Sequence, residues 1–370
     1  MNYKIFLSLI IAFFILSCSN NKYKTVISGN IPNLPDGKLY LYKDKYNDRI
    51  DSVETHKGKF EMRYQRKTAE PQYLGIEHID QQGIKRSFSF PTNAKYKGSG
   101  CNSQYFFSDS IIAINGELEE FTPKNLILSP QYKLVKNPKI SAGMQTKALY
   151  NIDCDLFNNF SAPSILLIKN KIRQYPYSYH LLYNIDDNKN SFSPQQVDEF
   201  LKLFKGEITE SESFKKLSAY NKKRFTEKEI AMPLLENSTG KKSEIMDSKY
   251  KKHLIVFWAS WCGPCRQEIP LLKTIYKNKN PDLEFISISI DEDRKAWKKA
   301  LNEEQMTWKQ YIIAEKDPDY EKIQMRFRLN GAIPYTVLVD NDFKIIKATV
   351  GLSSEKNLKD FIKIEKVSDK

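Results

Sequence analysis

Two cysteines separated by two residues, Cys262 and Cys265, constrain the fold of this chain more than any other feature. They follow an apolar run at 252–258, which is typical of a buried central strand, and they precede a segment with helical periodicity. A cysteine at the start of a helix faces unpaired backbone N–H groups and the positive end of the helix dipole, which stabilise its thiolate. We therefore expect Cys262 to be an exposed nucleophile. Cys265, on the same face of the helix, is expected to be the shielded resolving cysteine.

A Cys-x-x-Cys pair can alternatively form half of a zinc site. Zinc requires two more ligands at a suitable spacing. The other candidate ligands form no recognisable second half-site; they are Cys18, Cys101, Cys154, His56, His78, His180 and His253. We therefore predict a redox-active dithiol, no metal site and no cofactor.

The segment 230–370 alternates between patterns typical of strands and of helices. After the strand at 252–258 and the helix that carries the cysteines, the sequence predicts the following elements: a strand at 284–290, a helix at 293–304, a strand hairpin at 335–340 and 344–349, and a helix at 355–364. A βαβ unit followed by a hairpin and a closing helix is the thioredoxin plan. We therefore expect an α/β thioredoxin fold over 230–370.

The sequence around the dithiol is similar to that of a known family. Residues 252–270, KHLIVFWASWCGPCRQEIP, resemble the TlpA/ResA-like thiol-disulfide oxidoreductases, which are thioredoxin-like proteins of the AhpC/TSA superfamily. In that family a proline far along the chain has a cis peptide bond and lies beside the dithiol, where backbone groups hold the substrate. The resemblance therefore implies a cis bond before Pro334, and it implies substrate contacts from Trp261, Gly263, Pro264, Ile333 and Pro334.

Glu268 is a candidate for proton transfer. At 100° per residue it lies between Leu272 and Ile275, so a carboxylate interrupts an apolar stripe. The family also has a glutamate three residues after the second cysteine, and it is linked there to proton handling; burial would raise its pKa. The alternative is a solvent-facing glutamate on a helix bent by Pro270. Thioredoxin has an aspartate six residues before its first cysteine, but this chain has Val256, which leaves more of the proton handling to Glu268.

The N-terminus is predicted to be an export signal. Lys4 precedes an apolar run at 5–16, which is too short to cross a bilayer as a helix. The run ends in Ile-Leu-Ser-Cys, which resembles a bacterial lipobox. This resemblance implies a lipoprotein signal peptide at 1–17, lipidation of Cys18 and a tether at 18–23; the alternative is a cleaved signal peptide with an incidental Cys18. We therefore expect a periplasmic protein of the cell envelope, anchored to a membrane by lipid.

Export also bears on the remaining cysteines, because disulfides persist outside the cytoplasm. Cys101 and Cys154 are predicted either to pair or to be buried thiols, and the sequence leaves both alternatives open.

Two further segments precede the dithiol domain. Over 24–125, short alternating runs are separated by turn signals such as Asp36-Gly37, which predicts a mainly β, sandwich-like domain. The stretch SGNIPNLPDGKLYLYKDKYNDRIDSVETHKGKFEMRY resembles a small β-domain of unknown function that precedes thioredoxin domains in envelope lipoproteins. Over 126–229 we predict a mainly helical connector, with helical periodicity from about residue 142 and helices that begin near Pro194 and Glu212.

The net charge of +13 comes from scattered lysines and arginines, so we expect no nucleic-acid partner. The expected partners are thiols and disulfides of exported proteins, a membrane electron donor, and the membrane itself through the lipid anchor. The expected function is reduction of disulfides by dithiol exchange. Two alternatives are a thiol peroxidase of the same fold, and an envelope binding lipoprotein with an accessory redox domain.

Overall fold

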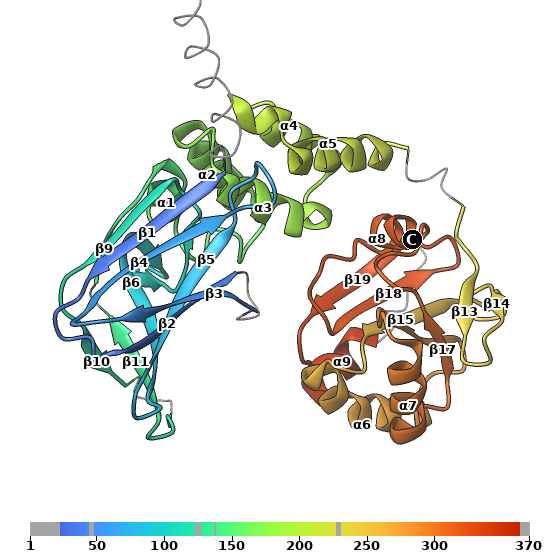
Figure 1. The fold of residues 1–370 in the computed structure, drawn as a ribbon. Helices are drawn as coiled ribbons and strands as arrows, with labels where there is room; N and C mark the ends of the chain where they lie inside the picture. The colour runs from blue at the N-terminus through green and yellow to red at the C-terminus, as the bar shows by residue number, and fades with distance from the viewer. Residues whose placement is uncertain (1–22, 44–47, 123–126, 137, 227–230, 363–370) are drawn as a thin grey trace, which may run out of the picture. The chain divides into compact units, whose positions relative to one another are not determined.

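The computed structural model of the chain describes residues 23–43, 48–122, 127–136, 138–226 and 231–362. Cys18, the signal peptide predicted at 1–17 and almost all of the predicted tether lie outside these ranges. The described residues divide into two compact units (Figure 1): the first lies within 1–186 and 198–218, and the second within 187–197 and 219–370. Among the helices of these residues, none has the length and apolar character needed to span a membrane.

The first unit contains two β-sheets that share one core. The four-stranded sheet has the order β12 (Lys139–Ser141), β9 (Ile111–Asn115), β1 (Lys24–Asn30) and β4 (Lys59–Gln65). The second sheet has the order β10 (Glu119–Phe121), β11 (Tyr132–Lys136), β6 (Lys85–Tyr96), β5 (Tyr73–Asp80), β2 (Gly37–Lys43) and β3 (Asp48–Thr55); β7 (Ser99–Ser103) pairs with β6, and β8 (Phe106–Phe107) with β5. Ile27 and Ile112 of one sheet pack in the same core as Leu41 and Phe88 of the other, as expected of a sandwich.

The sheets continue beyond residue 125, where the sequence analysis ended the β-domain. Strand β11 pairs in parallel with β6, and β12 pairs antiparallel with β9. Val135 of β11 is fully buried in the shared core. The start of the connector is therefore corrected, because 132–141 completes both sheets before the first helix begins.

Among the described residues, five α-helices lie between β12 and β13 (Leu235–Asn237) in the chain. They are α1 (Met144–Leu149), α2 (Ala162–Gln174), α3 (Tyr179–Asp187), α4 (Pro194–Leu201) and α5 (Glu212–Arg224). The helices predicted to begin near Pro194 and Glu212 are both present. A disulfide joins Cys101 of β7 to Cys154, which lies just after α1, so the alternative of two unpaired thiols is excluded.

The end of the connector is also corrected. Within the second compact unit, the Asn190 side chain donates a hydrogen bond to the Leu329 carbonyl (2.8 Å), and its own amide oxygen accepts one from Tyr220 (3.0 Å). The Arg224 guanidinium donates to the Phe192 carbonyl (2.6 Å). Residues 187–197 and the end of α5 therefore belong with the segment predicted to start at residue 230.

The second unit is built on one seven-stranded sheet. Its order is β14 (Lys242–Ser243), β13 (Leu235–Asn237), β17 (Lys309–Ile312), β16 (Leu283–Ser289), β15 (Lys252–Trp258), β18 (Tyr335–Asp340) and β19 (Ile345–Val350). Strands β15, β16 and β17 are parallel, and β18 runs antiparallel to β15. Four helices accompany the sheet: α6 (Gly263–Lys277), α7 (Arg294–Glu304), α8 (Tyr320–Phe327) and α9 (Glu355–Ile362). This arrangement is the α/β thioredoxin fold that the sequence predicts.

Strand β15 is buried on both faces, which explains its continuous apolar sequence. Leu254 and Val256 point to a core that includes Leu272 of α6 and Leu358 of α9. The alternate residues of β15 point to the opposite core, with Trp297 of α7 and Phe327 of α8. The strand is therefore rigidly held, and so is the dithiol that follows its carboxyl end.

Candidate functional site

The dithiol lies in the turn that connects β15 to α6. The Cys262 N–H donates to the Ala259 carbonyl (3.1 Å), which closes the turn. Cys262 is the N-cap of α6, and its Sγ accepts a hydrogen bond from the Cys265 backbone N–H (3.2 Å). Pro264 lies in the first turn of the helix, where its missing N–H costs no hydrogen bond. The local sequence therefore directs the Cys262 sulfur to the positive end of the helix.

Cys262 and Cys265 form a disulfide, and both are buried, with 5% and 2% of their surface exposed. The expectation of an exposed Cys262 is therefore corrected. The exposed surface of the loop belongs to its neighbours: Trp261 is 67% exposed, and Gly263 and Pro264 are also exposed. These residues therefore form the exposed surface beside the buried sulfur atoms.

Ile333, which precedes Pro334, lies against the dithiol although it is 71 residues from Cys262 in sequence. The Ile333–Pro334 peptide bond is cis, and the Ile333 carbonyl oxygen is 3.9 Å from Cys262 Sγ. Pro334 is buried, and its carbonyl accepts a hydrogen bond from the Gly351 N–H (2.8 Å), which joins the start of β18 to the end of β19. The fold thus brings Cys262, Cys265, Ile333 and Pro334 together.

Glu268 is buried on α6, with 1% of its surface exposed, so the alternative of a solvent-facing glutamate is wrong. Helix α6 continues through Pro270 to Lys277. One carboxylate oxygen of Glu268 accepts a hydrogen bond from the Ser353 N–H (2.9 Å), whereas the other is buried without a hydrogen-bond partner. Burial raises the pKa of this carboxyl group, and the hydrogen bond from Ser353 opposes the rise only in part.

The sequence analysis did not single out Asp291, which is 1% exposed and follows β16. Its carboxylate accepts hydrogen bonds from the Ser260 N–H (2.8 Å), the Ser260 hydroxyl (2.6 Å) and the Ser289 hydroxyl (2.6 Å). Its position after β16 could have indicated that it lies near the dithiol turn, because the carboxyl ends of parallel neighbours such as β15 and β16 meet at the same edge of a sheet.

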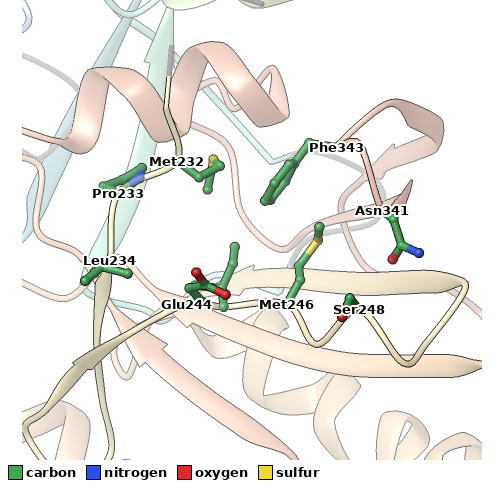
Figure 2. A pocket seen from close by; sticks show the side chains of 9 residues that line it. Met232, Pro233, Leu234, Glu244, Met246, Ser248, Asn341 and Phe343 are labelled. Atoms are coloured by element: carbon green, nitrogen blue, oxygen red, sulfur yellow. The ribbon is translucent and has the colours of Figure 1, made fainter. Parts of the chain in front are cut away.

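A separate hollow of about 290 Å³ lies elsewhere in the second unit. Met232, Met246 and Phe343 are among the side chains around it (Figure 2). Asn341 also lines it and follows Asp340, which pairs with Lys252 at the start of β15. The dithiol instead follows the last residue of that strand. The hollow is therefore not part of the dithiol site. Across the described ranges, no cluster of three or more His, Cys, Asp or Glu side chains is arranged to hold a metal ion.

Two family models match the chain. A model described as thioredoxin-like matches residues 250–345, which include the dithiol, Glu268 and Pro334. A model of a domain of unknown function, DUF4369, matches residues 25–121 in the first unit.

Curated relatives match about a third of the chain. The thiol-disulfide oxidoreductase ResA of Bacillus thuringiensis (strain Al Hakam) is 31% identical over 125 residues, which are 34% of this chain and 69% of that protein. ResA of Bacillus subtilis (strain 168) is 24% identical over 134 residues, which are 36% of this chain and 72% of that protein. A solved thiol-disulfide oxidoreductase from Bacteroides fragilis NCTC 9343 is 24% identical, with 36% of this chain and 99% of that chain covered and a TM-score of 0.29. The dithiol lies at the start of a helix, and the chain is 31% identical to ResA over 69% of that protein. The chain therefore belongs to the ResA-like thiol-disulfide oxidoreductases, which have a thioredoxin fold.

Proposed function

We propose that the protein is a lipid-anchored reductase of the cell envelope, which reduces disulfides in other exported proteins by dithiol exchange. The placement of Cys262 supports this most directly, because its sulfur caps α6 and lies 3.9 Å from the Ile333 carbonyl at the cis bond. The Gly-Pro spacer between the cysteines is that of thioredoxin, whose reduction potential is about −270 mV, whereas strong oxidants lie near −120 mV.

Reduction of a substrate disulfide takes two exchange steps. The Cys262 thiolate attacks one substrate sulfur, the substrate S–S bond breaks, and the released substrate thiolate takes up a proton. The Cys265 thiolate then attacks the Cys262 sulfur and releases the second substrate cysteine, which is also protonated. The Cys262–Cys265 disulfide that remains is reduced again by two electrons and two protons, supplied through a membrane electron donor.

The substrate chain is expected to lie in extended form beside the backbone of Ile333 and Pro334, with Trp261, Gly263 and Pro264 at its other side. The exposure of Trp261 beside a buried Cys262 supports this docking surface. We expect Trp261→Ala to raise KM for a protein disulfide several-fold, with a smaller effect on kcat and on exchange with glutathione. Equal losses for protein and glutathione substrates would contradict substrate docking by Trp261.

Glu268 is proposed to accept the proton of the Cys265 thiol as that cysteine becomes nucleophilic. The buried oxygen without a partner and the raised pKa support this role, because a general base is most effective when its pKa lies near the working pH. We expect Glu268→Gln to slow the resolving step roughly 100-fold, as is typical for general acid–base catalysis. Formation of the mixed disulfide by Cys262 should be unchanged, and stopped-flow kinetics with a fluorescent disulfide substrate separates the two steps.

The reduction potential of the Cys262–Cys265 pair tests the direction of the reaction. The protein without residues 1–18 is equilibrated with glutathione buffers, and mass spectrometry of alkylated peptides follows this pair while Cys101–Cys154 remains intact. A value near −270 mV supports a reductase, and a value near −120 mV would overturn that assignment in favour of disulfide formation. A Cys265→Ser variant traps substrates as mixed disulfides on Cys262 and identifies them.

The lipid anchor needs a separate test. Incorporation of a labelled fatty acid into the full chain, and its loss in Cys18→Ser, is the expected result. A full chain that takes up no label and is released into the soluble fraction would contradict the anchor while leaving the reductase proposal intact.

A further inference from the structure

The turn that carries the reactive cysteine is held by a buried carboxylate on the neighbouring strand. Ser260 is the second residue of the turn that the Cys262 N–H and the Ala259 carbonyl close. Its backbone N–H donates to Asp291 Oδ2 and its hydroxyl donates to Oδ1 of the same carboxylate. Both oxygens of Asp291 are thus used on one residue of the turn.

Asp291 is itself fixed in place. Its Oδ2 also accepts from the Ser289 hydroxyl, and its backbone N–H donates back to the Ser289 oxygen (3.0 Å). Ser289 is the last residue of β16 and is fully buried, and the Ile290 N–H just beyond it donates to the Trp258 carbonyl (2.9 Å). The carboxylate therefore connects the turn to the rigid centre of the sheet.

This connection has two consequences for the dithiol. The first is geometric, because Trp261 and Cys262 directly follow the residue that Asp291 holds. The second is electrostatic: the carboxylate contacts Ser260, two residues before Cys262, and a buried negative charge near a thiol disfavours the thiolate. A less stable thiolate makes the dithiol form less stable relative to the disulfide, which lowers the reduction potential.

Other titratable groups lie on the elements around the dithiol. Arg266 of α6 lies next to Cys265, but its guanidinium pairs with two glutamates of α7. Glu268 of the same helix is buried, which raises its pKa, and one of its carboxylate oxygens accepts a hydrogen bond from the Ser353 N–H. Tyr335 of β18 packs in the same core as Cys262, and burial raises its pKa to about 12, so its phenol is neutral. Asp291, which follows β16, is the carboxylate that accepts hydrogen bonds from the turn itself.

We propose that Asp291 is a positioning residue for the dithiol: it holds the Ala259–Cys262 turn in place, and its charge makes the site a stronger reductant. The inference deepens the proposed reductase function and rests on it. Its carboxylate accepts from both the backbone N–H and the side-chain hydroxyl of Ser260 in that turn.

Two substitutions separate charge from position. In Asp291→Asn, the amide oxygen can accept from the Ser260 N–H and the Ser289 hydroxyl, while the amide nitrogen donates to the Ser260 oxygen; the bonds remain and the charge is lost. Asp291→Ala removes both. Asp293→Asn is the matched control, because Asp293 is exposed and caps α7 through the Lys295 N–H (2.8 Å), a role that asparagine also fulfils.

The readouts are the pKa of the Cys262 thiol, from the pH dependence of its alkylation, and the exchange equilibrium with glutathione at pH 8. In Asp291→Asn we expect the thiol pKa to fall by about one unit, the usual size for a nearby charge. The equilibrium should move up to about ten-fold toward the dithiol, which corresponds to about 30 mV. Asp291→Ala should show the same shifts together with slower reduction of a protein disulfide. Asp293→Asn should show neither.

The proposal is overturned if Asp291→Asn leaves both the thiol pKa and the equilibrium unchanged, whatever Asp291→Ala does to folding. Thermal unfolding of each variant shows whether a lost activity reflects an unfolded protein. The wild-type equilibrium from the same titration tests the reductase function separately. A strongly oxidising wild type would refute that function, whereas the difference between wild type and Asp291→Asn would still decide whether Asp291 affects the dithiol.

Discussion

At the residue scale, the buried carboxyl group of Glu268 makes the stability of the second unit depend on pH. Its pKa is raised by burial in the folded chain, whereas in the unfolded chain it has the ordinary value of a glutamate. Between these two values the folded chain binds more protons than the unfolded chain. The free energy of unfolding therefore falls as the pH rises through this window, and the contribution is fully present only below the unfolded pKa.

We expect Glu268→Gln to remove this fall. Relative to the wild type, the variant should gain stability progressively as the pH rises above the ordinary pKa of a glutamate, because the amide carries no charge that burial can penalise. Urea unfolding of both proteins at several pH values measures the difference. Glu315→Gln, at an exposed position of the same unit, should show no such trend. A stability difference that is independent of pH would contradict the raised pKa.

The sequence predicted the surroundings of Glu268 only in part. Helical periodicity placed Glu268 on the apolar stripe with Leu272, and both are buried in α6. Its hydrogen bond from Ser353 could not be predicted, because 85 residues separate the two and only the tertiary fold brings them together. The same holds for Asp291, whose partner Ser260 lies 31 residues earlier, in the turn between β15 and α6.

At the scale of elements, the Cys101–Cys154 disulfide fixes a segment along β6 of the first unit. The Cys154 N–H donates to the Lys95 carbonyl (2.8 Å), and the Asp153 carboxylate accepts from the Lys95 N–H (2.9 Å). The Asp155 carboxylate accepts a hydrogen bond from the Lys97 N–H (2.8 Å), in the turn between β6 and β7. Alternating runs predicted most strands of this unit, but no local pattern indicates which segment will lie against the end of β6.

We expect Cys101→Ser/Cys154→Ser to destabilise the first unit. The cysteines are 53 residues apart, and a cross-link over such a loop stabilises a fold by about 2–4 kcal/mol through the unfolded chain. Thermal unfolding should show an earlier transition for the first unit only. Cys262→Ser/Cys265→Ser is the control: it should abolish exchange and leave the first unit's transition in place. Equal unfolding of the serine variant and the wild type would show that this disulfide contributes no stability.

At the scale of the whole molecule, the two compact units do not follow the order of the chain. Residues 187–197 belong to the second unit, although the residues on either side of them, in α3 and α4, belong to the first. Sequence patterns located the dithiol domain through its alternating strands and helices, because that signal is local. They did not predict that residues 187–197 belong to the second unit, because this depends on contacts such as the hydrogen bond from Asn190 to Leu329, 139 residues away.

Asn190→Ala tests whether the contacts of residues 187–197 stabilise the second unit. The Leu329 carbonyl loses its side-chain donor and Tyr220 loses the Asn190 acceptor, at a site where Asn190 is buried. Loss of a buried hydrogen-bond partner costs about 1–3 kcal/mol, so the transition of the second unit should fall by several degrees while that of the first stays unchanged. Asn190→Asp keeps the acceptor for Tyr220 but not the donor to Leu329, and it should show that Leu329 depends on the amide. If both transitions fell together in calorimetry, the units would unfold as one and the division into two would be refuted.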